Sequence, residues 1–207
     1  MNFQDNATMS LPNFKYFYNN KAKTLDVVLH GGSQGMDSSL INKIVEASRK
    51  KGNSVVAFNF PYIERGEEKS SGPELLEEIG ALQSILDFCQ ADRFDSIRLI
   101  GKSLGGVVAG HYLKKLDRDQ LNKFSLIIFG YDIGYIDLKN FPGKIVIIQG
   151  EKDKFGDVEA VKSDMRGAIS KNIVYLSVKG ADHSYRVPET KEPIYEDEAV
   201  SKAFECL

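Results

Sequence analysis

The sequence predicts an α/β fold in which a mostly parallel central sheet is covered by helices on both faces. From residue 25 onward, short apolar runs rich in β-branched residues alternate with segments whose apolar residues recur every three or four positions. The strand-like runs are nearly continuous in hydrophobicity, whereas a sheet with one face in water would select for alternation. A length of 207 residues fits one domain, which we expect to span residues 1–207.

The expected strands are six short runs, most of which lead into loops containing glycine or asparagine. They cover residues 25–29, 55–58, 97–100, 126–129, 145–148 and 173–176. Aromatic residues surround Asn19-Asn20 within residues 13–24, and this pattern predicts an antiparallel hairpin that feeds the first parallel strand. Residues 1–12 are expected to form a poorly ordered N-terminus.

Helical stripes separate the expected strands. They comprise Ile41, Ile44, Val45 and Ser48, then Leu75, Ile79, Leu82, Leu86 and Cys89, then Val158, Val161, Met165 and Ile169, and finally Ala199, Val200, Ala203 and Phe204. Lys51-Gly52 is a stop signal for the first helix. Pro73 is expected in the first turn of the second helix, where its missing N–H costs nothing.

The composition excludes several classes of protein. With 42% hydrophobic residues, 27% charged residues and a net charge of -2, the chain is neither a disordered nor a nucleic-acid-binding type. The first residues lack a signal-peptide pattern and no apolar run is long enough to span a membrane, so we expect a cytoplasmic monomer or small homo-oligomer that acts on a small molecule. Cys89 and Cys206 are expected to be reduced thiols, and neither a metal nor a cofactor is predicted.

Ser103 is the predicted nucleophile. It lies in Gly101-Lys102-Ser103-Leu104-Gly105-Gly106, which follows an expected strand and opens an expected helix, as a G-x-S-x-G nucleophile elbow requires. The glycines two residues before and after the serine are expected because a Cβ there would clash in so sharp a turn. A phosphate-binding turn is the other interpretation, but neither phosphate-loop motif is present.

A serine hydroxyl needs a base, and the chain has three histidines. His183 follows the last expected strand in a short polar loop, from which an imidazole could reach the carboxyl ends of the strands, so we predict that it is the base. His111 lies inside the helix after the elbow and is expected to be a structural or surface residue. His30 is expected to shape the loop that follows the first parallel strand.

The predicted acid is Asp153, which lies in the first turn after the strand at 145–148. Glu151, Asp157 and Asp182 remain alternatives. Asp157 already enters the next helix, and Asp182 adjoins the predicted base too closely in sequence to face its ring.

The oxyanion hole is predicted from two backbone N–H groups. One belongs to Leu104, the residue after the nucleophile. The other belongs to Gly32 in the loop His30-Gly31-Gly32-Ser33, with Gly31 and Ser33 as alternatives. The resulting order of serine, aspartate and histidine along the chain is the order found in α/β-hydrolases.

Over residues 14–207 these motifs resemble the α/β-hydrolase superfamily. The segments 30–37, 59–66, 101–106 and 180–184 are similar to a small dienelactone-hydrolase-like branch of mostly bacterial hydrolases, whose eukaryotic relatives include a subunit of a chromatin complex. Members of that branch usually carry arginine at the position of Lys102, and true dienelactone hydrolases use cysteine where this chain has Ser103.

The resemblance implies an α/β-hydrolase fold and a carboxylesterase-like serine hydrolase. In the superfamily a lid often follows the strand that corresponds to residues 126–129, and the stretch from Tyr131 to Gly143 is too short for one. A lidless site favours hydrolysis of small or exposed substrates. A thioesterase or peptidase would use the same triad, and a non-catalytic binding or scaffold protein could share the fold.

Overall fold

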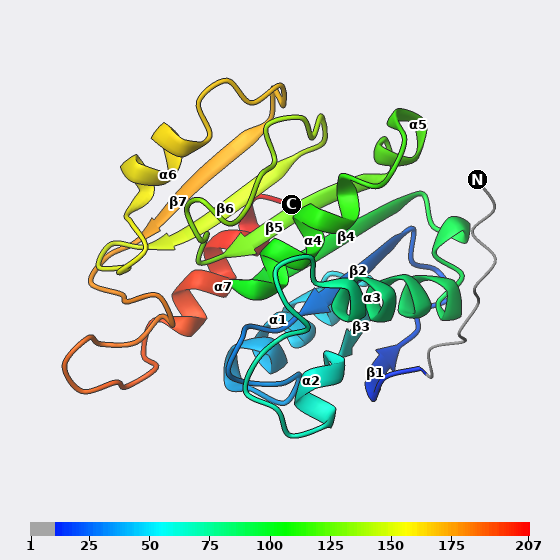
Figure 1. Cartoon of the computed structure of the whole chain (residues 1–207), viewed down its shortest axis with the longest axis horizontal. Coiled ribbons are helices and arrows are strands. Elements are labelled where there is room, and N and C mark those ends of the chain that lie inside the picture. The colour runs from blue at the N-terminus through cyan, green and yellow to red at the C-terminus, as the bar shows by residue number, and fades with distance from the viewer. Residues whose placement is uncertain (1–10) are drawn as a thin grey trace.

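Seven strands form one sheet in the computed structural model, which describes residues 11–207 (Figure 1). They are β1 (Phe14–Phe17), β2 (Thr24–Leu29), β3 (Ser54–Phe58), β4 (Ser96–Lys102), β5 (Phe124–Phe129), β6 (Ile145–Gly150) and β7 (Ile173–Val178). The spatial order is β1-β3-β2-β4-β5-β6-β7, and every neighbouring pair except β1–β3 is parallel. The predicted fold class and all six predicted parallel strands are confirmed.

The near-continuous hydrophobicity of the strands has the predicted cause, since apolar side chains are buried on both faces of the sheet. In β2, Leu25, Val27 and Leu29 belong to one hydrophobic cluster. Val28 points the other way, into a second cluster. Each face of the sheet therefore has its own core, which needs helices to cover it.

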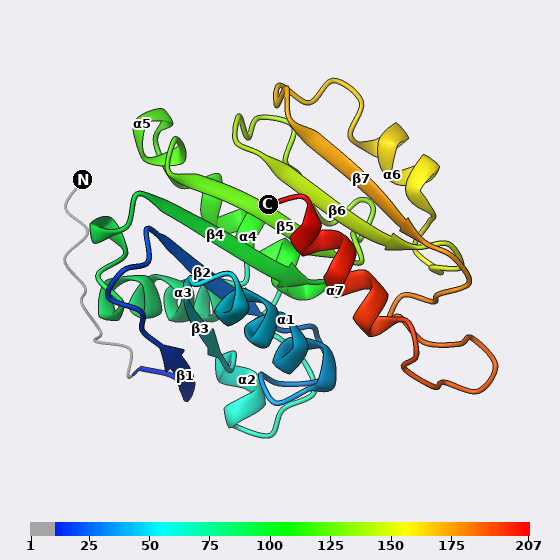
Figure 2. The same ribbon diagram turned by 180° about the vertical axis from the view of Figure 1, so that it is seen from behind.

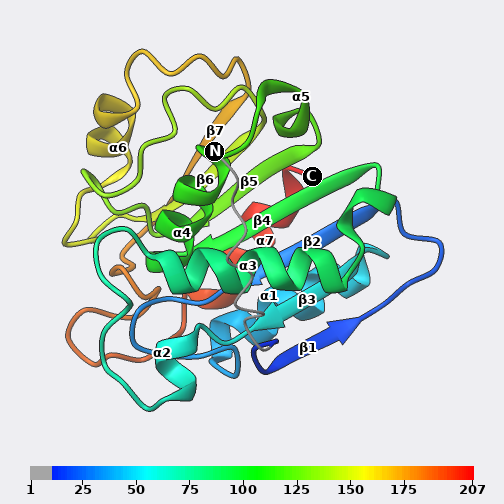
Figure 3. The same cartoon turned by 45° about the vertical axis from the view of Figure 1, so that its right-hand side comes forward.

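Helices supply that cover on both faces. Helices α1 (Ser39–Lys50) and α7 (Glu196–Glu205) pack together on the face seen in Figure 2. Helices α3 (Leu76–Phe88), α4 (Leu104–Leu113) and α6 (Val158–Asp164) cover the opposite face, as Figure 3 shows for α3 and α4. The remaining helical turns are α2 (Pro61–Glu64), α5 (Arg118–Leu121) and η1 (Ala91–Arg93).

The predicted N-terminal hairpin is wrong in its pairing. Strand β1 is antiparallel, but it pairs with β3, in the register Phe14 opposite Phe58, and not with β2. Both edges of β2 are already occupied by β3 and β4, so β1 pairs with the outer edge of β3. Asn19 anchors the turn after β1, because its side-chain amide donates to Gly52 O at 2.7 Å and its N–H donates to Ser54 Oγ at 3.0 Å.

Two of the predicted helices begin or end elsewhere. Leu75 has a left-handed backbone with φ of 51°, so α3 begins at Leu76 and Pro73 lies in the turn before it, not in its first turn. Helix α6 ends at Asp164, and Ile169, which was expected on its apolar stripe, is half exposed. The end of α1 is as predicted, with Gly52 at φ of 80°.

The connection between β5 and β6, residues 130–144, contains no helix or strand, so no lid domain is inserted there. Of the segment 1–12 that was expected to be poorly ordered, residues 1–10 lie outside the described residues, and Pro12 is buried. None of the helices in residues 11–207 has the length and apolar character needed to cross a bilayer.

Candidate active site

Ser103 lies between the end of β4 and the start of α4, in a strained turn. Its φ and ψ are 49° and -114°, a conformation that non-glycine residues rarely adopt. A Cβ on Gly101 would lie 2.4 Å from Gly106 N, and one on Gly105 would lie 2.3 Å from Leu29 O. Both contacts are far shorter than real carbon atoms allow, so the two glycines have the steric role predicted from the sequence.

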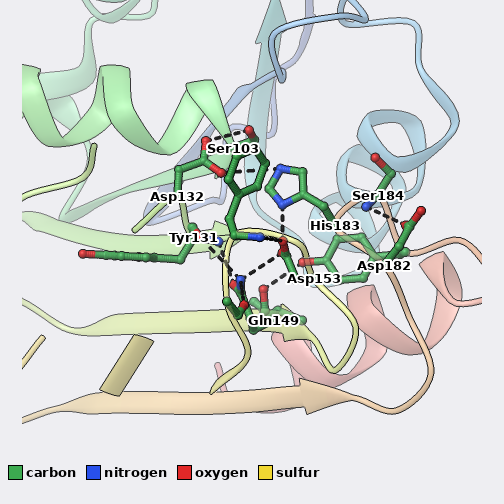
Figure 4. Close-up of polar contacts among 12 residues, drawn as sticks. Ser103, Tyr131, Asp132, Gln149, Asp153, Asp182, His183 and Ser184 are labelled. Carbon is green, nitrogen blue, oxygen red and sulfur yellow. Dashed lines mark hydrogen bonds and ion pairs between the residues drawn. The ribbon is translucent and has the colours of Figure 1, made fainter. Parts of the chain in front are cut away.

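His183 and Asp153 meet beside the serine, each from the loop after a different strand (Figure 4). The imidazole Nδ1–H donates to Asp153 Oδ2 at 2.7 Å. Asp153 also accepts from the Gln149 side-chain amide at 2.9 Å and from the Phe155 N–H at 2.9 Å. The Phe155 ring meets the imidazole edge-on at 4.7 Å between centroids. The Asp153 carboxylate therefore accepts from three donors. Its bond to Nδ1–H in turn fixes the tautomer of the ring, which leaves Nε2 without a proton.

A second carboxylate, Asp132, lies on the other side of the imidazole (Figure 4). The Ser103 hydroxyl donates to Asp132 Oδ2 at 2.8 Å. His183 Nε2 lies 3.6 Å from Asp132 Oδ1, and neither of these two buried atoms has a hydrogen-bond partner among residues 11–207. The hydroxyl and the imidazole therefore both face Asp132, and the hydroxyl is bonded to that carboxylate and not to the imidazole.

Sequence reasoning missed Asp132, although the signal that selected Asp153 applied to it equally. It comes in the first turn after the strand at 126–129, and the carboxyl ends of parallel strands meet at one edge of a sheet. The geometry adds Asp132 to the residues that the site brings together.

The other acidic candidates serve local structure. The Glu151 carboxylate accepts from the Gly180 N–H at 2.8 Å. Asp157 is the N-cap of α6, where it accepts from the Ala160 N–H at 2.9 Å. Asp182 accepts from two N–H groups of its own loop, at 2.8 and 2.9 Å. None of the three contacts the imidazole, whereas Asp153 does.

The loop that was expected to supply an oxyanion donor is held by two buried side chains. The His30 Nδ1–H donates to Gly31 O at 2.7 Å, and its Nε2 accepts from the Phe60 N–H at 2.9 Å. The Tyr62 hydroxyl donates to Gly32 O at 3.0 Å. Burial lowers the pKa of His30 to about 4 and raises that of Tyr62 to about 12, so both remain neutral at ordinary pH. His30 shapes its loop, as the sequence predicts.

Several backbone N–H groups near Ser103 have no acceptor in the described chain. Among them are those of Gly32, of its alternatives Gly31 and Ser33, and of Leu104, the first residue of α4. A Cβ on Gly31 would lie 4.0 Å from the Ser103 Cβ, and one on Gly32 would lie 4.0 Å from a Leu104 methyl group, so the loop passes directly over the elbow. The N-terminus of α4 adds a positive dipole at the same place.

The Lys102 ammonium group lies near three carboxylates, those of Asp132, Asp153 and Asp182. Its side chain is partly buried, and burial lowers the pKa of the ammonium to about 8 although Asp132, Asp153 and Asp182 all oppose the decrease. A Cβ on Gly130 would lie 2.9 Å from Lys102 Nζ and 2.9 Å from the His183 Cε1, which explains why a glycine with φ of 70° stands there. The imidazole of His183 therefore lies near several charged groups, namely the Lys102 ammonium and the neighbouring carboxylates.

Two cavities open beside Ser103. One, of about 90 Å³, is bordered by the Gly31–Gly32 loop, Ser103, His183 and Arg186. The other, of about 420 Å³, lies on the side of Asp132 and Leu104 and is mostly apolar. Among residues 11–207 there is no group of three or more histidine, cysteine or acidic side chains arranged to hold a metal ion.

Several solved structures are similar to this chain in fold. A lidless α/β serine hydrolase from Xanthomonas campestris has a TM-score of 0.68 at 20% identity, covering 89% of this chain and 82% of its own. For an α/β serine hydrolase homologue from Coxiella burnetii the TM-score is 0.70 at 18% identity, with 91% and 90% of the two chains covered. For an esterase from Pyrococcus furiosus the TM-score is 0.64 at 18% identity, covering 91% of this chain and 82% of its own.

At these identities the solved structures establish the fold alone. No curated protein matches the sequence. The family model described as an alpha/beta hydrolase domain matches residues 22–206. The chain therefore belongs to the alpha/beta-hydrolase family.

Proposed function

We propose that this hydrolase is a serine esterase in which Ser103 attacks the carbonyl carbon of a small ester. The observation that carries the proposal is the 2.7 Å bond from His183 Nδ1 to Asp153, because it leaves Nε2 unprotonated on the side of Ser103. An acid, an imidazole and a hydroxyl at the ends of three parallel strands are the groups that acyl transfer requires.

The reaction proceeds in two halves. In the first, the Ser103 hydroxyl turns from Asp132 to His183, which takes its proton as Oγ bonds to the carbonyl carbon. The N–H groups of Leu104 and Gly32 bind the oxyanion, and the imidazolium returns the proton to the departing alcohol. In the second half, water attacks the acyl carbon while His183 takes a proton from it. The bond from that carbon to Ser103 Oγ then breaks, His183 returns the proton to Oγ, and the carboxylic acid product leaves.

The open site favours small or exposed substrates. The connection at 130–144 forms no lid domain, so water reaches the acyl-enzyme and hydrolysis is favoured over transfer to another acceptor. The esterase from Pyrococcus furiosus with this fold supports ester hydrolysis. Thioesters and amides would use the same groups, and a panel of matched esters, thioesters and amides ranks the three.

Fluorophosphonate labelling and Ser103→Ala test the proposal directly. The wild-type protein should react with the probe and hydrolyse a short-chain nitrophenyl ester. Ser103→Ala should remain unlabelled and lose on the order of 10⁴-fold or more in kcat. Ser201→Ala is the matched control, because Ser201 is exposed on α7 and its hydroxyl bonds Glu205. Near-wild-type esterase activity in Ser103→Ala would contradict the assignment.

A non-catalytic binding protein is the second candidate, and one observation favours it. The Ser103 hydroxyl donates to Asp132, which is a weaker base than an imidazole, so the nucleophile is not activated in this arrangement. A wild-type protein that reacts with no fluorophosphonate and hydrolyses no member of the panel would support this role.

A further inference from the structure

The Asp132 carboxylate plays no part in holding its own loop. The loop is fixed by backbone groups, since Asp132 O accepts the N–H groups of Tyr135 and Ile136 at 3.1 and 3.3 Å. Of the carboxylate oxygens, Oδ2 bonds only the Ser103 hydroxyl and Oδ1 has no hydrogen-bond partner in the described chain. A buried, incompletely satisfied carboxylate costs free energy, so its place beside a nucleophile points to a ligand.

The same carboxylate borders the larger cavity beside the nucleophile. This cavity of about 420 Å³ is lined mainly by apolar side chains, among them Leu75, Leu104 and Val107. Tyr135, which is 70% exposed, and Phe155 also line it. Asp132 is the only carboxylate among the lining residues. The cavity therefore suits an apolar group that carries one positive charge close to the reacting carbonyl.

No cation of the described chain neutralises Asp132 by direct contact. Lys102 is near enough for the two charges to influence each other, yet it forms no ion pair with Asp132 within 4.0 Å. The imidazole Nε2, at 3.6 Å from Oδ1, is an acceptor when the ring is neutral and offers no proton to the carboxylate. The carboxylate is available to a donor that arrives with the substrate.

We propose that Asp132 is a specificity-determining residue that binds the α-ammonium group of an aminoacyl ester, whose apolar side chain occupies the cavity beside Leu104. The inference rests on the proposed serine esterase. An α-ammonium lies two bonds from the carbonyl carbon that Ser103 Oγ attacks, and Asp132 Oδ2 lies 2.8 Å from that Oγ, so one carboxylate can reach both groups. A charge-assisted bond of this kind is among the stronger hydrogen bonds in proteins.

Binding of the ammonium to Asp132 would also change the hydrogen bond that the serine hydroxyl makes. An ammonium that donates to Asp132 competes with the hydroxyl for the same oxygen, and it releases the hydroxyl to donate to His183 Nε2. A substrate without the amino group leaves the hydroxyl bonded to the carboxylate. The amino group therefore favours both binding and the reactive arrangement.

A pair of matched esters tests the inference. Leucine ethyl ester and 4-methylpentanoate ethyl ester have the same carbon skeleton and differ only in the amino group. Their kcat/KM values are measured for wild type, Asp132→Asn and Asp137→Asn, at a pH where the amino group is protonated. Asp137→Asn is the control, because Asp137 lies in the same loop but pairs with Lys114 on the surface. Thermal unfolding shows whether each variant is folded.

The wild-type enzyme and Asp137→Asn should prefer the leucine ester by at least about tenfold in kcat/KM. Asp132→Asn should lose at least about tenfold on the leucine ester. On the deaminated ester it should be no slower than wild type, because an amide oxygen accepts from the Ser103 hydroxyl more weakly than the carboxylate does. Equal rates of wild type on both esters, or equal losses of Asp132→Asn on both, would overturn the inference and leave the esterase intact. A wild-type protein that hydrolyses neither ester refutes the inference, and fluorophosphonate labelling then shows whether the serine esterase fails too.

Discussion

Acidification should destabilise this protein through His30, whose side chain has no exposed surface. Both ring nitrogens are used in the neutral form, because Nδ1–H donates to Gly31 O and Nε2 accepts from the Phe60 N–H. A second proton would break the bond to Phe60 and place a charge in an apolar region. Burial accordingly lowers the pKa of His30 from 6.5 to about 4.

The sign and size of the effect follow from this shift. As the pH falls below 6.5, the unfolded chain takes up a proton on His30 before the folded protein does. The contribution of His30 to the free energy of unfolding is therefore fully present above pH 6.5, and it decreases as the pH falls to about 4. A shift of roughly 2.5 units corresponds to about 3 kcal/mol in total, of which about 2 kcal/mol is lost between pH 7 and pH 5.

Urea unfolding at several pH values between 7 and 4 measures the effect in wild type and in His30→Gln. Other groups titrate in the same range, so the informative quantity is the difference between the two proteins at each pH. Glutamine has no proton to gain, and its amide oxygen can accept the Phe60 N–H. The free energy of unfolding of wild type minus that of His30→Gln should decrease by about 2 kcal/mol between pH 7 and pH 5. A difference that stays constant with pH would refute the reasoning.

Three further substitutions test packing and polar contacts, two of them at the site and one inside the sheet. Gly105→Ala should lower the free energy of unfolding by about 3 kcal/mol or more, measured in urea, because the new Cβ would lie 2.3 Å from a backbone oxygen at the end of β2. Gln149→Leu should lower kcat on a nitrophenyl ester about tenfold with KM little changed, because Asp153 loses one of the donors that orient it. Arg98→Met should cost about 3 kcal/mol in urea, because Asp26 stays buried in β2 without its cation at 3.3 Å.

A control variant or a contradicting outcome accompanies each of these substitutions. Gly110→Ala lies in the same helix as Gly105, but its Cβ would find no atom closer than 3.7 Å, so its stability should change little. An equal loss in both alanine variants would contradict the steric reason. For Gln149→Leu, a rise in KM with kcat unchanged would show that the amide serves binding. For Arg98→Met, adding Asp26→Asn should restore part of the stability, and a further loss would argue against an unpaired carboxylate as the cause.

The parallel strands and the main helices could be predicted because their signals are local. Six runs of apolar, β-branched residues became β2 to β7, and stripes at helical spacing became the buried faces of α1, α3 and α7. Ser103, Asp153 and His183 could be proposed together because parallel strands end at one edge of a sheet. The partner of β1 could not be predicted in the same way. It depended on the fact that β2 is flanked on both sides by β3 and β4.

Local patterns in the sequence were enough to predict the fold class, the glycines of the elbow and the strand ends that carry Ser103, Asp153 and His183. The directions in which the side chains at those strand ends point became known from the folded chain. Asp132 turns toward Ser103 because Gln149 holds the Tyr131 N–H at 2.7 Å and the backbone of the following turn closes on Asp132 O. Those contacts join residues up to 18 positions apart. A local sequence pattern does not predict such contacts, because the direction of a side chain depends on neighbours that the folded chain brings together.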